Sequence, residues 1–172
     1  MATMFEGLSR EELEGMLEDA ALNWLAHDGL WFLAVEDRFD METAIDLDTR
    51  AWESFTIIEA RRIMKRHGIE QGGGIDALAR ALRYRLYAFI NKQEIVEQSE
   101  DRLLFRMNDC RVQAARKKKG LPDFPCKPVG LVEYSGFART IDPRIETRCV
   151  GCPPDEHPDG WYCTWEFTLG SE

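Results

Sequence analysis

Apolar residues in the first half of the chain recur at spacings of three and four, the period of an amphipathic helix. A first helix is predicted to begin at Ser9, because Ser9 and Glu12 have the spacing of a reciprocal N-terminal cap. Asp28 and Gly29 are expected to break or bend it before residues 30–39 continue in helical register. Its predicted buried stripe consists of Leu13, Met16, Leu17, Ala20, Ala21, Trp24 and Leu25.

Two more helices are predicted before residue 94. One runs from Met41 to His67 and ends at Gly68, which suits a left-handed terminator. The other covers residues 75–93. Its inward side chains are Leu78, Leu82, Leu86, Phe89 and Ile90.

From residue 94 onward the pattern changes to short alternating segments rich in β-forming residues. The predicted order is β-β-α-α-β-β, with strands at 95–98, 102–108, 144–151 and 161–169 and helices at 110–120 and 131–141. The fold class is therefore α+β, with an N-terminal helical layer followed by an antiparallel sheet of about four strands. Residues 1–172 form a single domain with a helical part, 1–93, and an α+β part, 94–172.

Composition narrows the range of partners. The chain has 22 basic and 31 acidic residues, a net charge of −9, so nucleic acid is not an expected partner. No apolar run is long enough to span a membrane, and the first residues lack a secretory signal. We therefore expect a cytoplasmic protein. Its five cysteines, an odd number, favour free thiols or metal ligands over structural disulfides.

One segment near the end of the sequence concentrates candidate metal ligands. Cys149, Cys152, His157 and Cys163 follow the spacing C-x2-C-x4-H-x5-C. Thiolates and an imidazole converging from a small loop suit a tetrahedral zinc site, and iron is a second candidate. The alternative is a hairpin loop stiffened by prolines, with partly buried thiols that bind no metal.

The first helices hold a second set of polar candidates. Asp28 and Glu36 lie among aromatic residues of the first helix. Carboxylates held on an apolar helix face would have raised pKa values and could transfer protons. The alternative is that Asp28 caps the continuing helix while Glu36 is solvated or pairs with Arg61 or Arg62. An arginine such as Arg62 could anchor a ligand carboxylate, or simply lie on the surface. Large rings on these helices are core residues first, but they could also line an apolar pocket. The candidate ligand-binding residues are His27, Asp28, Trp31, Glu36 and Arg62.

The closing stretch resembles the end of the 4-vinyl-reductase type domain, a small-molecule-binding domain. The resemblance is carried by Cys149, Gly151, Gly160, Cys163 and Phe167. It implies an apolar ligand pocket, with the N-terminal helices supplying both the pocket and a homodimer surface. A different hypothesis is that the protein binds no ligand and acts through its dimer surface alone.

Residues 105–169 also resemble the L-2-amino-thiazoline-4-carboxylic acid hydrolase-like proteins. The matching positions are Cys110, Gly120, Leu121, Pro122, Cys126, Cys149 and Cys163. This likeness implies that the cysteines cluster at one edge of the sheet. It also implies hydrolysis of a C–N or C–S bond in a small cyclic amino acid. Cys126 or Cys110 would be the nucleophile, or zinc-bound water would attack. The first helices are similar to a set of uncharacterised small cytosolic proteins of bacteria and archaea.

Overall fold

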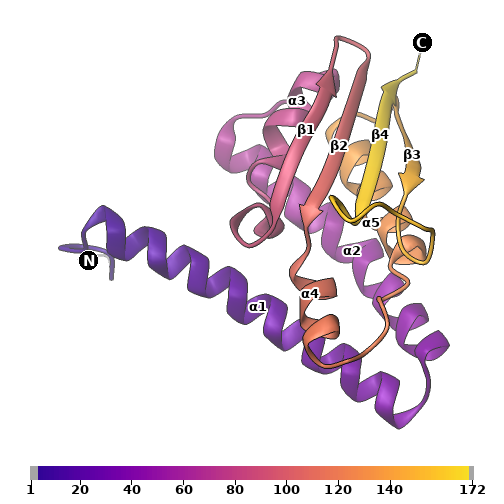
Figure 1. Cartoon of the computed structure of the whole chain (residues 1–172). Coiled ribbons are helices and arrows are strands. Elements are labelled where there is room, and N and C mark those ends of the chain that lie inside the picture. Colours follow the sequence, from indigo (N-terminus) through magenta and orange to yellow (C-terminus); the bar gives the residue numbers. More distant parts are fainter. Residues whose placement is uncertain (1–3, 171–172) are drawn as a thin grey trace.

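The computed structural model describes residues 4–170 and shows a four-stranded antiparallel sheet with helices on one face (Figure 1). The α+β fold class is thus confirmed, with most of the helical residues before the sheet. In chain order the elements are α1 (Arg10–Arg38), α2 (Met41–His67), α3 (Gly74–Leu82), the 3-10 turn η1 (Leu86–Phe89), β1 (Lys92–Gln98), β2 (Arg102–Asp109), α4 (Arg111–Lys118), α5 (Lys127–Ile141), β3 (Ile145–Gly151) and β4 (Cys163–Leu169).

The predicted N-terminal cap of the first helix and the predicted end of the second are confirmed. The Ser9 hydroxyl accepts a hydrogen bond from the Glu12 backbone N–H at 3.2 Å, and the Glu12 carboxylate accepts one from the Ser9 N–H at 2.8 Å. Helix α2 ends as expected at Gly68, in the left-handed conformation with φ of 59°. The expected break at Asp28 and Gly29 is wrong, since α1 continues through both residues. One glycine inside a long helix lowers its stability without ending it.

The single helix predicted over residues 75–93 is also wrong. Helix α3 ends at Leu82, and Arg85 has an extended backbone with ψ of 150° before η1 begins. Strand β1 already starts at Lys92. The chain leaves the helical path at the same place where the Arg85 guanidinium is buried and paired with Glu59 and Glu133.

The sheet has the strand order β1-β2-β4-β3, so the last strand along the sequence lies between two earlier ones. All neighbours are antiparallel, and the two predicted hairpins are present. Alternation along β2 turns Leu103, Phe105 and Met107 toward the helices. Facing them on β4 are Phe167, Trp165 and Cys163, respectively.

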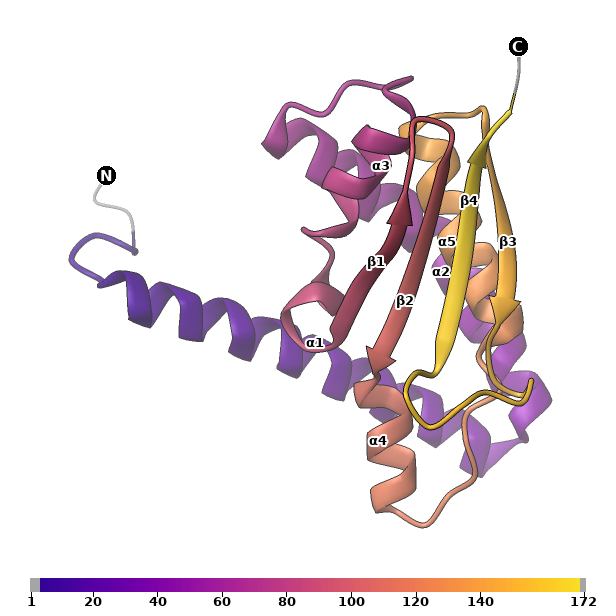
Figure 2. The same ribbon diagram turned by 45° about the horizontal axis from the view of Figure 1, so that its top comes forward.

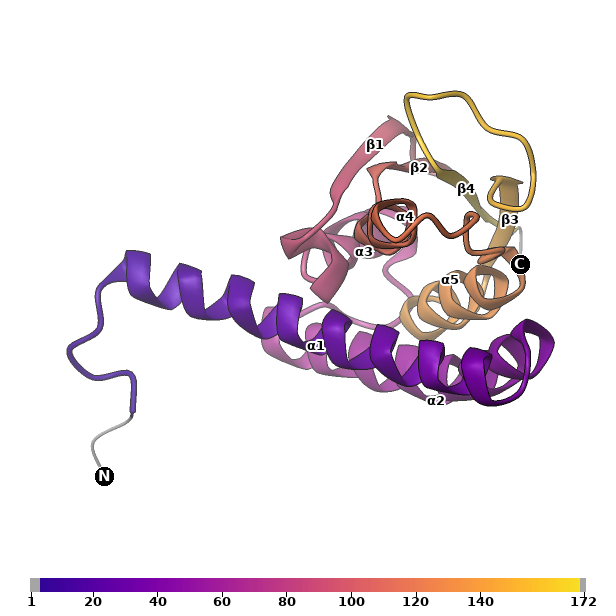
Figure 3. The same ribbon diagram turned by 60° about the horizontal axis from the view of Figure 1, so that its bottom comes forward.

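The helices on the inner face form two layers. Helix α5 packs against β3, and α2 packs on the outer side of α5 (Figure 3). The fully buried Trp165 stacks on Tyr134 of α5, with ring centroids 4.7 Å apart. Gly130 allows this approach, because a Cβ atom there would lie 2.6 Å from the Trp165 ring. Within residues 4–170, no helix has both the length and the hydropathy needed to cross a bilayer.

The N-terminal half of α1 extends away from the rest of the molecule (Figures 1 and 2). Of the buried stripe predicted for this helix, Ala21 alone is buried, whereas Met16 and Leu17 are exposed. The prediction failed because helical periodicity gives an apolar face but does not say what covers it. The predicted homodimer surface would lie here, and it stays a prediction.

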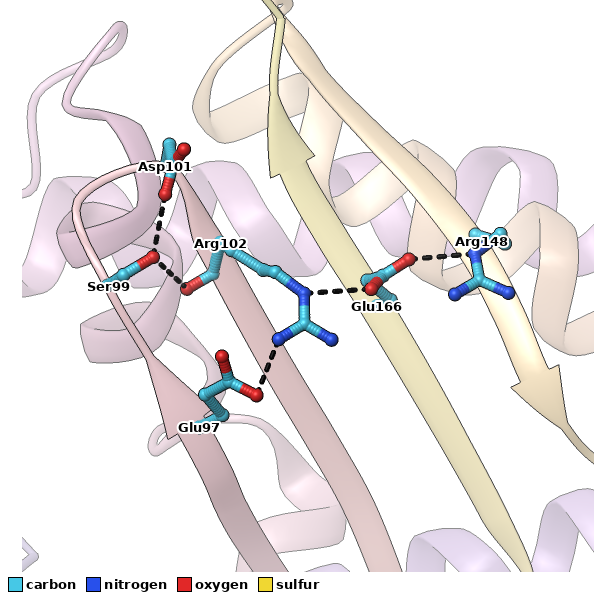
Figure 4. Close-up of polar contacts among 6 residues, drawn as sticks. All are labelled: Glu97, Ser99, Asp101, Arg102, Arg148 and Glu166. Atoms are coloured by element: carbon cyan, nitrogen blue, oxygen red, sulfur yellow. Dashed lines mark hydrogen bonds and ion pairs between the residues drawn. The ribbon is translucent and has the colours of Figure 1, made fainter.

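The outer face of the sheet is polar and carries a line of ion pairs across all four strands (Figure 4). Arg102 on β2 pairs with Glu97 on β1 at 2.5 Å and with Glu166 on β4 at 2.8 Å. Glu166 also accepts a hydrogen bond from Arg148 on β3 at 2.7 Å. The two arginines hold the pKa of Glu166 below its usual value. These pairs satisfy the charges of Arg102, Glu166 and Arg148 on this face.

Candidate functional site

A cavity of about 440 Å³ lies between the helical layer and the inner face of the sheet. The residues in its wall belong to α1, α2, α4, α5 and the sheet. Figure 3 shows how these helices and strands are arranged, with the bottom of Figure 1 turned forward. Small-molecule sites typically have volumes of about 300–1,000 Å³. This cavity is therefore the candidate functional site. The aromatic residues in its wall are Phe32, Trp52, Tyr87, Phe124, Tyr134 and Trp165.

The rings of this wall hold one another in place. Trp52 stacks on Tyr87 with centroids 5.9 Å apart, and Phe32 meets Phe124 edge to face at 4.7 Å. Such contacts restrict side-chain rotation and add to the energy of burial. The apolar part of the site is thus formed by the fold itself, before any ligand binds.

A buried arginine joins the cavity wall to the core. Arg85 is 1% exposed and pairs with Glu59 at 2.9 Å and with Glu133 at 2.7 Å. Burial alone would lower the pKa of Arg85, but the two carboxylates raise it. Burial raises the pKa of Glu133, and the charge of Arg85 opposes that rise. One cation thus serves two carboxylates, and Glu133 extends this buried negative charge to the cavity.

Two further carboxylates line the cavity, Asp28 from α1 and Asp48 from α2. Burial raises the pKa of both. For Asp48 the pKa reaches about 7, because the charges of Asp28 and Glu133 add to the effect of burial. A hydrogen bond with the Trp52 side chain acts in the opposite direction. At neutral pH, Asp48 is therefore partly protonated.

All five cysteines are free thiols, and four of them gather beside the cavity. The Sγ atoms of Cys126 and Cys152 are 3.4 Å apart. Cys152 also lies within hydrogen-bonding reach of Cys149 and Cys163. These four residues, which we call the thiol cluster, come from the start of α5, from β3 and its following loop, and from the start of β4. The predicted clustering of Cys126, Cys149 and Cys163 is thus present, with Cys152 at its centre. Cys110, the fourth cysteine of the prediction, is near enough to Cys126 and Cys163 for their charges to act on it, but no hydrogen bond joins it to another thiol among residues 4–170.

The thiols differ in acidity. Neighbouring thiols, Cys126 first, raise the pKa of Cys152. The hydrogen bond with Cys152 lowers the pKa of Cys149, and the positive charge of Lys127 acts in the same direction. Burial raises the pKa of Cys110 to about 12, so this thiol is protonated at neutral pH.

Most of the ligand-binding residues expected from sequence lie outside the cavity. Asp28 is in its wall, but Trp31 is 66% exposed and His27 packs against the Trp31 ring. Arg62 is on the surface of α2. Glu36 pairs with neither Arg61 nor Arg62. It accepts two hydrogen bonds from Arg116 of α4, at 2.9 and 3.3 Å, and thereby fixes α1 to α4 beside the cavity.

The predicted zinc ligands are brought together only in part. The His157 ring faces Asp123, with 3.7 Å between Nε2 and the carboxylate, and packs near Trp161 and Tyr162. In the thiol cluster Cys126 joins the three predicted cysteines in place of His157. As the side chains stand, the part of the chain from residue 4 to residue 170 contains no group of three or more His, Cys, Asp or Glu residues that could hold a metal ion.

Sequence reasoning missed Arg85, Asp48 and Glu133. Asp48 and Glu133 each occupy a position on an apolar helical stripe, and Arg85 occupies such a position in the apolar periodicity of the sequence although α3 ends before it. This position is the signal that could have found them. Asp48 lies four residues from both Ala44 and Trp52, which are buried. The same spacing puts Glu133 between Val129 and Phe137, and Arg85 follows Leu82 by three residues. A charged residue at such a position must find a partner or a function.

Comparison with known families gives one match. A model described as a family of unknown function, DUF6125, matches residues 6–169. No curated protein and no solved structure gives a significant match. The resemblances to the 4-vinyl-reductase type domain and to the thiazoline hydrolases are not tested by this match and stay predictions.

Proposed function

We propose that this chain, which belongs to the family of unknown function DUF6125, binds a small and largely apolar molecule in the central cavity. The observation that carries the proposal is the cavity of about 440 Å³, walled by aromatic rings from both the helical layer and the sheet. Apolar ligands gain free energy from leaving water, and a preformed pocket reduces the entropy lost on binding. The 4-vinyl-reductase resemblance predicts the same class of function.

A cavity-filling substitution tests this proposal. Gly29 of α1 is in the cavity wall, and a Cβ atom there would meet nothing within 4 Å. We expect Gly29→Phe to occupy the cavity and weaken binding of the neutral probe 2-(1-naphthyl)ethanol by at least about tenfold, or 1.4 kcal/mol. Titration calorimetry measures the affinity.

Gly15→Phe is the matched control, because Gly15 lies in the same helix with equally open surroundings but outside the cavity. Both substitutions remove one glycine from α1, so their effects on helix stability should be similar. If Gly29→Phe binds the probe as tightly as Gly15→Phe does, the cavity is not the binding site.

We also propose that the thiol cluster holds one zinc ion, with iron as the alternative metal. Support comes from the contacts that Cys152 makes with Cys126, Cys149 and Cys163 and from the C-x2-C spacing. Four sulfur ligands at about 2.3 Å are typical of structural zinc sites. Small rotations of the four side chains would be needed. Bound metal would join the loop after β3 to the start of α5, which is a stabilising role and not a catalytic one.

Metal content distinguishes the two possible sets of metal ligands. One is the thiol cluster, and the other contains His157 in place of Cys126. We expect about one zinc per chain in wild-type protein purified without chelator, and much less in Cys126→Ser. His157→Ala should retain the full amount, because His157 faces Asp123 and not the thiols. Elemental analysis by mass spectrometry gives the ratio. Loss of metal in His157→Ala together with retention in Cys126→Ser would favour the set that includes the histidine, and wild-type protein without metal would reject the proposal.

The alternative function, hydrolysis of a thiazoline carboxylate by a thiolate, has weaker support. Cys110 and Cys126 both line the cavity, as a nucleophile should. However, a thiol with a pKa of about 12, as burial gives Cys110, is a poor nucleophile at neutral pH. The carboxylate of such a substrate would also meet the negative charges of Asp28 and Asp48.

We infer that the protein works in the cytoplasm. The free state of all five cysteines supports this inference, since closely spaced thiols persist in a reducing compartment.

A further inference from the structure

We propose that the ligand of the cavity is an organic amine, with an aromatic or aliphatic body in the apolar part of the site and an ammonium group bound by Asp28 and Asp48. This inference rests on the proposed function, and it names the chemical class of the ligand. It follows from the charges that face the cavity and from the rings that surround them.

The two aspartates lack a counter-ion. Both side chains are in the cavity wall, and within the described residues neither forms an ion pair. They come from different helices, Asp28 from α1 and Asp48 from α2, and are close enough for the charge of Asp28 to raise the pKa of Asp48. The charge of His27 lowers the pKa of Asp28, but burial outweighs it and the net shift is upward. The His27 side chain itself is exposed, where water and salt screen its charge. Asp48 has a hydrogen bond with the Trp52 side chain, but this bond does not neutralise its charge. Partly buried carboxylates without a counter-ion are unfavourable unless a cation reaches them.

The buried basic groups nearby are already engaged. Arg85 is shared between Glu59 and Glu133, at 2.9 and 2.7 Å. Arg116 pairs with Glu36 at 2.9 Å. Neither arginine can neutralise the aspartates without losing the ion pairs that it already forms.

The remaining charged groups of the wall do not change this balance. Arg111 of α4 and Lys119, which follows that helix, are exposed, where water and salt screen their charges. Burial raises the pKa of Tyr87, Tyr134 and Cys110, so that all three are neutral near pH 7. The uncompensated charge inside the cavity is therefore negative.

The aromatic wall suits a cation as well as an apolar body. The Arg85 guanidinium carbon lies 5.9 Å from the Trp52 ring centroid and 5.7 Å from that of Tyr87. These rings therefore already face one cation on their Arg85 side. An ammonium held by Asp48, one helical turn before Trp52, would lie beside the same group of rings. A neutral ligand would leave the aspartates unpaired, and an anionic one would be repelled.

Three probes with the same ring test the inference. They are 2-(1-naphthyl)ethylamine, 2-(1-naphthyl)ethanol and 3-(1-naphthyl)propionate, measured by titration calorimetry at pH 8 on the wild-type chain. We expect the amine to bind at least about tenfold more tightly than the alcohol, because a charge-assisted hydrogen bond is stronger than a neutral one. The propionate should bind most weakly.

Asp48→Asn removes one of the two carboxylates, so it should lower the affinity for the amine by a larger factor than the affinity for the alcohol and thereby reduce the preference for the amine. Asp46→Asn is the matched control, since Asp46 lies on the same helix but is exposed and pairs with Arg50. It should alter neither affinity. An alcohol that binds as tightly as the amine overturns the ligand class but not the cavity. Absence of binding by all three probes overturns the proposed function, and this inference with it.

Discussion

Arg85→Met should lower the free energy of unfolding by about 3–5 kcal/mol, because removing one member of a buried ionic group leaves its partners uncompensated. Glu59 and Glu133 would both remain buried without a cation. Methionine retains much of the apolar volume of the arginine side chain. The loss of stability therefore comes from the missing positive charge more than from lost packing. Chemical denaturation at pH 7.5 measures it. Arg83→Met, two residues away on the exposed side of the same turn, should change stability by less than about 0.5 kcal/mol.

A rescue variant separates charge from packing. Adding Glu59→Gln and Glu133→Gln to Arg85→Met removes both uncompensated charges. We expect the triple variant to recover most of the lost stability, since replacing a whole buried ionic group is often close to neutral. A triple variant that stays as unstable as Arg85→Met would show that the guanidinium acts mainly through packing against the rings around it.

Asp48→Asn should stabilise the protein by about 2 kcal/mol above pH 7, roughly half of the full linkage value for this shift because the side chain is partly exposed. The pKa of Asp48 is raised from 3.8 to about 7 in the folded state. Between these two values the folded state binds more protons than the unfolded one, so wild-type stability falls as pH rises. The gain should be absent near pH 4, grow through pH 7 and stay constant above it.

Denaturation curves at several pH values follow this difference. The control is again Asp46→Asn, whose carboxylate is exposed and forms a surface pair with Arg50. It should change stability by a few tenths of a kcal/mol at every pH. If the gain in stability of Asp48→Asn does not vary with pH, the ionised carboxylate of Asp48 does not destabilise the folded state. A gain of the expected form would indicate stability given up for binding, as is common at functional sites.

The predictability of the fold from sequence varied with the kind of signal. Local signals worked well: the Ser9 cap, the Gly68 terminator and the two hairpins are where the sequence placed them. The errors came from tertiary structure. Apolar periodicity continued past Leu82, but the helix ends there and Arg85 enters a buried ionic group. No local pattern reports a partner 48 residues away on α5.

The site was harder to predict than the fold. The spacing of the last three cysteines correctly drew attention to one loop, but the fourth thiol comes from Cys126, in a different element. Histidine and tryptophan attracted attention near Asp28 because of their chemistry, yet His27 and Trp31 turn outward. Carboxylates on apolar stripes were the better guide. Asp28 was found in this way, and Asp48 would have been.

The position of β4 also affects how the chain can fold during synthesis. This strand lies between β2 and β3, although both precede it in sequence. Until the ribosome has made residues 163–169, the sheet remains split, and Trp165 and Cys163 are missing from the cavity wall and the thiol cluster. The helical segments can form early, but the core is assembled from contacts between distant parts of the chain. Such non-local pairing slows folding. Until β4 pairs with them, β2 and β3 expose strand edges that could join another chain.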